Sequence, residues 1–367
     1  MHATIALLPG DGIGPEVVAA AADVLEAVAG RRGHTFTLTR SPFGAAALRA
    51  GDPPLPPATL ETCLAADAVL LGAVGDPAFS EGPRERRPET GLLELRKALG
   101  VYANLRPARV WPGLEDGGSL RAETLRGVDL LIVRELIGGI YFGEPRGRTS
   151  DRREAFDTMR YAAHEIERIA AVAFESARGR RKLVTSVDKA NVLESSRLWR
   201  EVVAEVASGY PDVRLEHQLV DSCAMRLVSD PGSFDVMLAG NLFGDILSDE
   251  AGAVVGSLGL LPSASVGGSG GLFEPVHGSA PDIAGRNLAN PVGAIASAAM
   301  LLRHALGLGA EADAIETAIG AALDAGCRTA DLAREGESSL SCTEMTRAIV
   351  DRLGPGPTGG SPRLRNG

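Results

Sequence analysis

The stretch that most constrains the fold is residues 240–249, GNLFGDILSD, which has the residue types of a helix. Asp245 and Asp249 are four residues apart, so a helix would place both carboxylates on one face. The apolar run 234–239 just before it is typical of a buried strand, and ligands of layered α/β proteins bind where such strands end. Two neighbouring carboxylates repel each other, so the pair is either a solvated helix face or part of a divalent-cation site.

Length, charge and cysteines exclude several classes of protein. The chain has 367 residues, which is enough for two lobes, and no apolar run approaches the length of a membrane span. Its net charge of −10 argues against nucleic-acid binding. The four cysteines form no CxxC pair, and the first residues are typical of a strand instead of a secretory leader. We therefore expect a cytoplasmic protein without a zinc site.

The beginning of the chain predicts an α/β fold but not a standard Rossmann domain. A strand over residues 4–8 leads into PGDGIGP, residues 9–15, and then into an alanine-rich helix to about residue 29. The glycine spacing of this loop differs from that of the dinucleotide-binding fingerprint. The next strand, near residues 36–39, ends in Arg40 where that fingerprint needs an acidic residue.

Arginine accompanies apolar residues in one predicted helix and recurs in the strand after it. Leu92, Leu93 and Arg96 should share one face of the helix, for which we expect Thr90 to be the N-cap. Such a face suits a ligand with an apolar branch beside a carboxylate, although a half-buried amphipathic helix would have the same pattern. Arg106 lies in the strand-like stretch that follows.

Charged side chains also stand at the ends of predicted strands. Arg134 directly follows the apolar strand 129–133, and Lys189 stands at the end of a later strand. Lys189 is either an activated base or a surface charge. Asn191 is the expected cap of the helix after Lys189. A further strand ends in Asp221, a third carboxylate that could complete the aspartate pair.

The last third of the chain contains three segments of distinct composition. Residues 267–285, GGSGGLFEPVHGSAPDIAG, hold glycines, prolines and a histidine in a pattern too constrained for a flexible linker. A long alanine-rich helix over residues 292–306 should be buried in the core. From residue 354 the chain has the composition of disorder.

These motifs resemble the isocitrate/isopropylmalate dehydrogenase family of metal-dependent, decarboxylating dehydrogenases. The resemblance runs from LPGDGIGPE to EPVHGSAPDIAG and includes ETGLLELRK, NLRP, VRELIGGIYFGEPRG, SVDKANVLE and GNLFGDILSDEAG, the last being the metal-binding signature. It implies a two-domain α/β fold with a central mixed sheet flanked by helices. We expect a cofactor-binding domain of residues 1–101 plus 256–353 and a second domain of residues 102–255, with a disordered tail over 354–367.

The resemblance implies NAD-dependent oxidative decarboxylation of (2R,3S)-3-isopropylmalate to 4-methyl-2-oxopentanoate and CO₂, a reaction of leucine biosynthesis. Arg96, Arg106 and Arg134 would hold the carboxylates of this dicarboxylate. Tyr141 and Lys189 would be the catalytic acid and base. By the same resemblance, one Mg²⁺ or Mn²⁺ per subunit would be bound by three carboxylates, those of Asp221, Asp245 and Asp249. Relatives take Lys189 and Asp221 from the partner subunit, so a homodimer with shared active sites is implied.

Specificity follows from the same resemblance. Leu92, Leu93 and a partner's Val192 would form an apolar wall for the isopropyl group, since burying a third carboxylate against leucine is costly. Asp282 can accept hydrogen bonds from ribose hydroxyls and would repel a 2′-phosphate, which favours NAD over NADP. The expected cofactor-binding residues are His277, Gly278, Ser279, Ala280, Pro281, Asp282, Ile283 and Asn290. Family members commonly benefit from potassium, so K⁺ is a further cofactor to consider.

Two alternatives stay open from the sequence. One is a related decarboxylating dehydrogenase acting on tartrate or malate, homoisocitrate or isocitrate. The other is a catalytically silent regulatory subunit, against which the intact arginines, acid-base groups and aspartates argue. Ile137 stands where the family usually has threonine, and Glu250 stands where an apolar or small residue is more usual. Neither departure affects a residue to which the resemblance assigns a catalytic or binding role.

Overall fold

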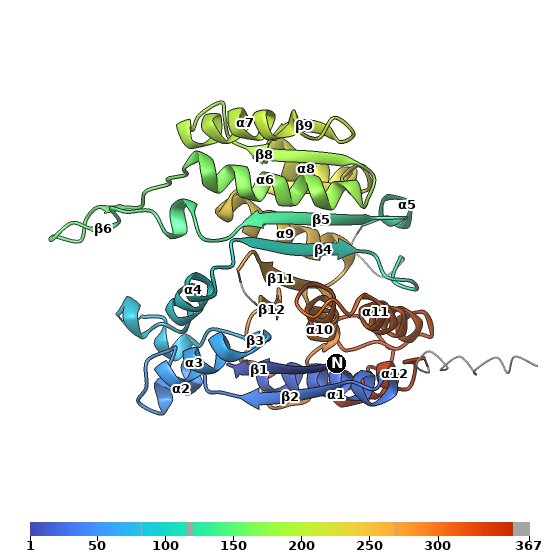
Figure 1. Cartoon of the computed structure of the whole chain (residues 1–367). Coiled ribbons are helices and arrows are strands. Elements are labelled where there is room, and N and C mark those ends of the chain that lie inside the picture. Colours follow the sequence, from blue (N-terminus) through green and yellow to red (C-terminus); the bar gives the residue numbers. More distant parts are fainter. Residues whose placement is uncertain (82, 116–119, 269, 355–367) are drawn as a thin grey trace, which may run out of the picture.

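One mixed sheet of ten strands runs through the computed structural model, which describes residues 1–81, 83–115, 120–268 and 270–354 (Figure 1). The strand order is β2-β1-β3-β12-β11-β4-β5-β10-β8-β9. The strands are β1 (His2–Gly10), β2 (Thr35–Arg40), β3 (Ala68–Ala73), β4 (Ala103–Arg109), β5 (Asp129–Glu135), β8 (Leu183–Asp188), β9 (Arg214–Leu219), β10 (Val236–Ala239), β11 (Pro262–Val266) and β12 (Leu272–Pro275). The prediction of an α/β fold with a central mixed sheet is confirmed.

The centre of the sheet is antiparallel and both of its sides are parallel. Strand β11 runs antiparallel to β12 and β4, and β4 runs antiparallel to β5, while the outer strands pair in parallel. The predicted first domain supplies β2, β1, β3, β12 and β11, and the predicted second domain supplies the other half of the order. The two-domain division stays a prediction, and under it the β11–β4 pair would be the junction.

Helices cover both faces of the sheet (Figure 1). One face is covered by α1 (Gly14–Arg32), α6 (Ala163–Arg178), α7 (Glu194–Ala207) and α10 (Val292–His304), with α11 (Gly309–Asp324) and α12 (Cys342–Val350) packed outside. The other face carries α3 (Pro57–Ala65), α4 (Pro88–Leu99), α8 (Val220–Ser229) and α9 (Asn241–Val255). The shorter helices are α2 (Ala45–Arg49) and α5 (Ala122–Leu125), and the 3₁₀ turns are η1 (Pro77–Phe79), η2 (Arg84–Arg86), η3 (Gly139–Tyr141), η4 (Pro231–Ser233) and η5 (Leu258–Leu260).

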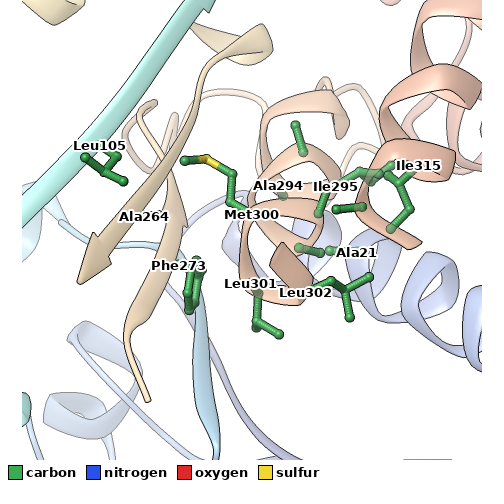
Figure 2. Close-up of a cluster of buried hydrophobic side chains, with 14 of the residues drawn as sticks. Ala21, Leu105, Ala264, Phe273, Ala294, Ile295, Met300, Leu301, Leu302 and Ile315 are labelled. Carbon is green, nitrogen blue, oxygen red and sulfur yellow. The ribbon is translucent and has the colours of Figure 1, made fainter. Parts of the chain in front are cut away.

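Helix α10 is the centre of the larger hydrophobic core, as the sequence predicted. Every residue from Val292 to Leu302 is buried. Met300 and Leu301 lie near Phe273 of β12 and the strands around it, whereas Ile295 lies between α10 and α11 (Figure 2). Alanines along α10 let neighbouring backbones approach closely, and the helix ends at His304, two residues earlier than expected.

Two predicted helix caps are wrong. Helix α4 begins at Pro88, with Arg87 at the N-cap position, so Thr90 lies inside the first turn. Proline fixes its own φ and lacks an N–H group, so it is well suited to the first position of a helix. Helix α7 begins at Glu194, and backbone hydrogen bonds from Val192 and Leu193 to the Lys189 carbonyl close the preceding turn without an Asn191 cap.

A two-stranded ribbon, β6 (Gly147–Arg148) and β7 (Ala155–Phe156), extends away from the main sheet (Figure 1).

All four cysteines are free, and Cys63, Cys223 and Cys342 are buried, which raises the pKa of each of these thiols to about 12. In the described part of the chain, no helix combines the length and apolar character needed to traverse a bilayer. The predicted disordered tail lies outside the described residues except for Gly354.

Candidate active site

Three buried arginines converge between α4 and the middle of the sheet. Arg96 is in the last turn of α4, Arg106 is in β4, and Arg134 is near the end of β5; their exposed fractions are 6%, 7% and 2%. Burial lowers the pKa of Arg134, and repulsion from Arg106 and Arg96 lowers it further. Clustered buried guanidinium groups are unfavourable without anions, so the sequence prediction of an anion site here has a physical basis.

Each arginine is held by partners from distant parts of the chain. Arg96 Nη2 is 2.7 Å from Glu274 Oε1, and in the described structure its Nε is buried without a hydrogen-bond partner. Arg106 donates from Nε to Asn104 Oδ1 at 2.7 Å and from Nη1 to Ser248 Oγ at 2.6 Å. These bonds fix the guanidinium planes while leaving N–H groups free for a ligand.

Helix α9 places Asp245 and Asp249 on one face, as the helical spacing predicted, and this face lies against the arginines. Arg106 Nη1 lies 3.4 Å from Asp245 Oδ1 and 3.6 Å from Asp249 Oδ1, and Arg134 Nη1 donates to Asp245. Burial opposes ionisation of Asp245, but Arg134 and Arg106 outweigh burial, so its pKa is lowered. Burial raises the pKa of Asp249, and the charge of Asp245 adds to that rise against the opposing effect of Arg106.

Tyr141 completes this group of side chains. It ends η3, the 3₁₀ turn that follows β5, and its hydroxyl donates to Asp245 Oδ2 at 2.9 Å. Burial raises the pKa of Tyr141, and the negative charge of Asp245 raises it further. Tyr141 therefore keeps its proton near neutral pH and can act as an acid.

Lys189 and Asp221 form a separate, more exposed pair. Lys189 Nζ lies 2.6 Å from Asp221 Oδ1, and this bond is the main cause of the lowered pKa of Asp221. Asp221 is in the first turn of α8 instead of at a strand end, because β9 stops at Leu219. Within the described residues of one chain, no group of three His, Cys, Asp or Glu side chains is close enough to hold a metal ion. One chain therefore does not bring Asp221 to the aspartate pair on α9.

The predicted apolar wall is only partly assembled in one chain. Leu92 and Leu93 are half-buried on α4, and Leu93 lines a surface hollow with Lys97 and Phe142. Val192 follows Lys189 and is 64% exposed.

The residues predicted to bind the cofactor form a loop supported by the turn after β1. Ile13 N donates to the Ser279 carbonyl at 2.8 Å, and a Cβ on Gly12 would lie 1.9 Å from that carbonyl oxygen. Glu16 Oε1 accepts from Gly285 N at 2.6 Å. The glycine-rich turn over residues 9–15 thus supports the 277–283 loop.

The loop itself offers groups suited to a nucleotide. His277 Nε2 is buried without a hydrogen-bond partner in the described structure, and burial lowers the pKa of this histidine, which keeps it neutral. Gly278 faces open space, and Pro281 and Asp282 are exposed. Ala280 and Ile283 are half-buried against the core. Asn290 is buried, and its side chain contacts Val292 N and Asp331 Oδ2, both at 3.0 Å.

The donor atoms fit the implied cofactors. Carboxylate oxygens are the ligands that Mg²⁺ and Mn²⁺ prefer, and α9 supplies two aspartates on one face. His277 Nε2, which has no hydrogen-bond partner among the described residues, would be available to a nucleotide base.

Several supporting residues were missed from the sequence. Asn104 shares the face of β4 with Arg106 because it is two residues earlier on a strand, and Ser248 shares the face of α9 with Asp245. Both periodicities could have identified them. Asn241 is four residues before Asp245 on α9, so the helical period also identifies it. Glu274 could not be found this way, since it contacts Arg96 from a distant segment.

The close approach of Arg134 to α9 generates a prediction at Gly244. A Cβ there would lie 2.8 Å from Arg134 Cγ and 2.9 Å from Arg134 Cβ. We expect Gly244→Ala to lower the free energy of unfolding by roughly 1–3 kcal/mol, as overpacking does. Urea denaturation measures this change, and the KM for the dicarboxylate substrate should rise as Arg134 shifts.

The matched control is Gly30→Ala. Gly30 lies exposed in α1, and a Cβ there would meet no atom within 4 Å. This control should gain up to about 1 kcal/mol from helix propensity. An equal gain in Gly244→Ala would contradict the steric account of Arg134.

Comparisons with known proteins agree with this geometry. The sequence model of the isocitrate/isopropylmalate dehydrogenase family matches residues 4–349. A 3-isopropylmalate dehydrogenase of Anaeromyxobacter dehalogenans is 55% identical over 356 residues, 96% of this chain and 100% of the relative. Another, of Salinibacter ruber, is 59% identical over 348 residues, 95% of this chain and 94% of the relative. A crystal structure of isocitrate dehydrogenase from Methylococcus capsulatus has a TM-score of 0.86 and 38% identity, covering 96% of this chain and 99% of that one. The chain belongs to the isocitrate/isopropylmalate dehydrogenase family.

Proposed function

We propose that this protein catalyses the NAD-dependent oxidative decarboxylation of (2R,3S)-3-isopropylmalate to 4-methyl-2-oxopentanoate and CO₂ in leucine biosynthesis. The observation that carries the proposal is the convergence of buried Arg96, Arg106 and Arg134 on Asp245 and its neighbours. Relatives that share 55% and 59% of their residues with this chain are 3-isopropylmalate dehydrogenases.

The charges of the site suit a dicarboxylate together with a divalent cation. Three guanidinium groups face the carboxylates of Asp245, Asp249 and Glu274, so the cluster is close to neutral. A dianion and a dication together add no net charge, whereas either alone would leave buried charge uncompensated. Arg96 has a buried Nε without a described partner and is well placed to take a substrate carboxylate oxygen.

The side chains of the protein would orient the substrate and move its protons. Asp245 and Asp249, with the partner subunit's Asp221, would hold the metal. The cation would supply a Lewis acid for the oxidised substrate, and NAD would supply the hydride acceptor. The partner subunit's Lys189 would accept the hydroxyl proton at Nζ. Tyr141, whose pKa is raised by burial, would then donate its proton to the carbon that has lost CO₂.

Exposed apolar residues support the homodimer in this proposal. Met225 and Val228 on α8 are 75% and 41% exposed, and Ile246 on the adjacent α9 is 56% exposed. Phe156 is exposed on the ribbon that extends from the sheet (Figure 1). A second copy covering α8 and α9 would bury this apolar surface and bring Lys189 and Asp221 to the neighbouring aspartate pair.

Cofactor choice and cellular location complete the proposal. The exposed Asp282 suits the ribose hydroxyls of NAD and would repel the 2′-phosphate of NADP. Residues 277–283 with Asn290 would contact the adenosine moiety, and K⁺ stays a proposed activator. The four free cysteines agree with a reducing, cytoplasmic setting.

NADH production tests the function directly. With Mn²⁺ or Mg²⁺ and NAD, we expect turnover of 3-isopropylmalate to exceed that of malate and isocitrate. Half-buried Leu92 and Leu93 would contact the isopropyl group, which malate lacks, and would disfavour the third carboxylate of isocitrate. Chelation should abolish activity, a divalent ion should restore it, and NADP should replace NAD poorly. A preference for isocitrate, or activity unchanged by a chelator, would contradict the proposal.

Subunit complementation tests whether two chains share each active site. Lys189→Met and Asp245→Asn should each be inactive as homodimers, because each substitution removes a required side chain from both active sites. After dissociation and reassociation of an equal mixture, a hybrid dimer would carry one intact site, giving about one quarter of wild-type activity. Each variant taken separately through the same procedure is the control. No recovery despite demonstrated hybrid dimers would show that Lys189 and Asp245 act within one chain.

A further inference from the structure

A buried carboxylate that has no part in the proposed chemistry lies directly behind the candidate active site. Glu135 is the last residue of β5 and is fully buried. It accepts hydrogen bonds from Ile137 N at 3.1 Å and Gly138 N at 2.8 Å, and Arg168 Nη2 lies 3.7 Å away. Burial raises its pKa, while the two backbone donors and Arg168 act in the opposite direction. Glu135 therefore holds the turn that leads from β5 to Tyr141.

Tyr161, just before α6, connects this carboxylate to the start of α9. Its hydroxyl accepts from Asn241 N at 2.7 Å, and its ring and the Glu135 carboxylate both lie against Gly138. Burial raises the pKa of Tyr161, and the negative charge of Glu135 raises it further, so the hydroxyl keeps its proton. The ring packs edge-on against Trp199, with centroids 5.4 Å apart. Tyr161 is thus fixed at both its ring and its hydroxyl.

Three glycines leave the space that Tyr161 occupies. A Cβ would approach an atom of Tyr161 to 2.9 Å at Gly138, 2.5 Å at Gly139 and 3.1 Å at Gly240. Gly139 also has a φ of +69°, which side-chain-bearing residues rarely adopt. The turn before Tyr141 and the turn before α9 therefore both pack against Tyr161.

Asn241 extends the network to the substrate-facing side. Its Oδ1 accepts from Arg134 Nε at 3.1 Å and Nη2 at 2.8 Å, which fixes one edge of the guanidinium group. Its Nδ2 donates to the carbonyls of Leu136 at 2.9 Å and Gly138 at 3.1 Å. Arg134 and Tyr141 both donate a hydrogen bond to Asp245, so the orientations of these two side chains depend on each other.

We propose that Tyr161 is a positioning residue that aligns Arg134 and Tyr141 on the two oxygens of Asp245. It acts on the arginine through its hydrogen bond with Asn241, and on the turn that carries the catalytic tyrosine through its packing against Gly138 and Gly139. The effect on catalysis rests on the proposed function, whereas the effect on dicarboxylate binding needs only the anion site. Loss of the hydrogen bond between Asn241 N and the Tyr161 hydroxyl would leave a buried N–H group unsatisfied and loosen both contacts.

Tyr161→Phe tests this inference, since it removes one oxygen and keeps the ring. We expect the Kd for 3-isopropylmalate with Mg²⁺, measured by calorimetry, to rise about tenfold, the usual size for one unsatisfied buried group. In turnover assays the KM for this substrate should rise and kcat should fall, because Arg134 and Tyr141 are both displaced. The KM for NAD should stay unchanged, since the hydrogen bonds described for the 277–283 loop do not involve Glu135, Tyr161 or Asn241.

Tyr210→Phe is the matched control. Tyr210 stacks on Phe174 and lies near Glu175. Burial raises the pKa of Tyr210, and the negative charge of Glu175 raises it further. Removal of the Tyr210 hydroxyl should leave the Kd and both KM values unchanged. If Tyr161 only stabilised the fold, Tyr161→Phe would lower the unfolding midpoint while the dicarboxylate Kd and kcat stayed at wild-type values. That result would overturn the inference. An inactive wild-type enzyme would instead overturn the proposed function and leave the calorimetric comparison decisive.

Glu135→Gln provides a second variant should Tyr161→Phe fail to fold. It keeps the size of the side chain but turns an NH₂ group towards backbone donors that need an acceptor. We expect the same direction of change, with weaker dicarboxylate binding and an unchanged KM for NAD. Wild-type dicarboxylate affinity in this variant would contradict the assigned role of the network.

Discussion

The contact between Arg134 and Asp245 is the interaction on which the candidate site depends. It joins the end of β5 to α9, and Gly244 permits it by leaving room for the arginine side chain. Arg106 and Tyr141 approach the same aspartate from β4 and η3. The Asp245 carboxylate thus contacts Arg134, which would bind substrate, and Tyr141, which would protonate product. It would also supply one ligand of the metal site. Its lowered pKa keeps it ionised across the physiological range.

The sheet explains why these groups can meet. Alternation along β4 and β5 points Asn104, Arg106 and Arg134 to the face that carries α4 and α9, while Leu105 and Val133 point to the core on the other face. Asn104 also donates to Ser265 of β11 at 3.0 Å, across the central antiparallel pair. The site therefore lies over the proposed junction of the two domains. Movement about that junction would change the distance between Arg96 on α4 and the other two arginines.

Most of the elements and many site residues could be predicted from the sequence. Period and composition predicted α9, α10 and the buried strands. Spacing on a helix face identified Arg96, Asp245 and Asp249, and a strand end identified Arg134. Contacts between distant segments could not be predicted, because no pattern links Tyr161 to Asn241 or Arg96 to Glu274. The expected caps at Thr90 and Asn191 were wrong because proline and backbone turns start those helices instead. Lys189 and Asp221 were expected near the aspartate pair only with a second copy, which one chain does not test.

The most direct test of this account is an anomalous-scattering map from crystals grown with Mn²⁺ and 3-isopropylmalate. The account predicts one strong peak per subunit, coordinated by Asp245 and Asp249 and by the partner subunit's Asp221, with substrate carboxylates on Arg96, Arg106 and Arg134. A peak away from the α9 aspartates, or a substrate bound without contact to these arginines, would contradict it.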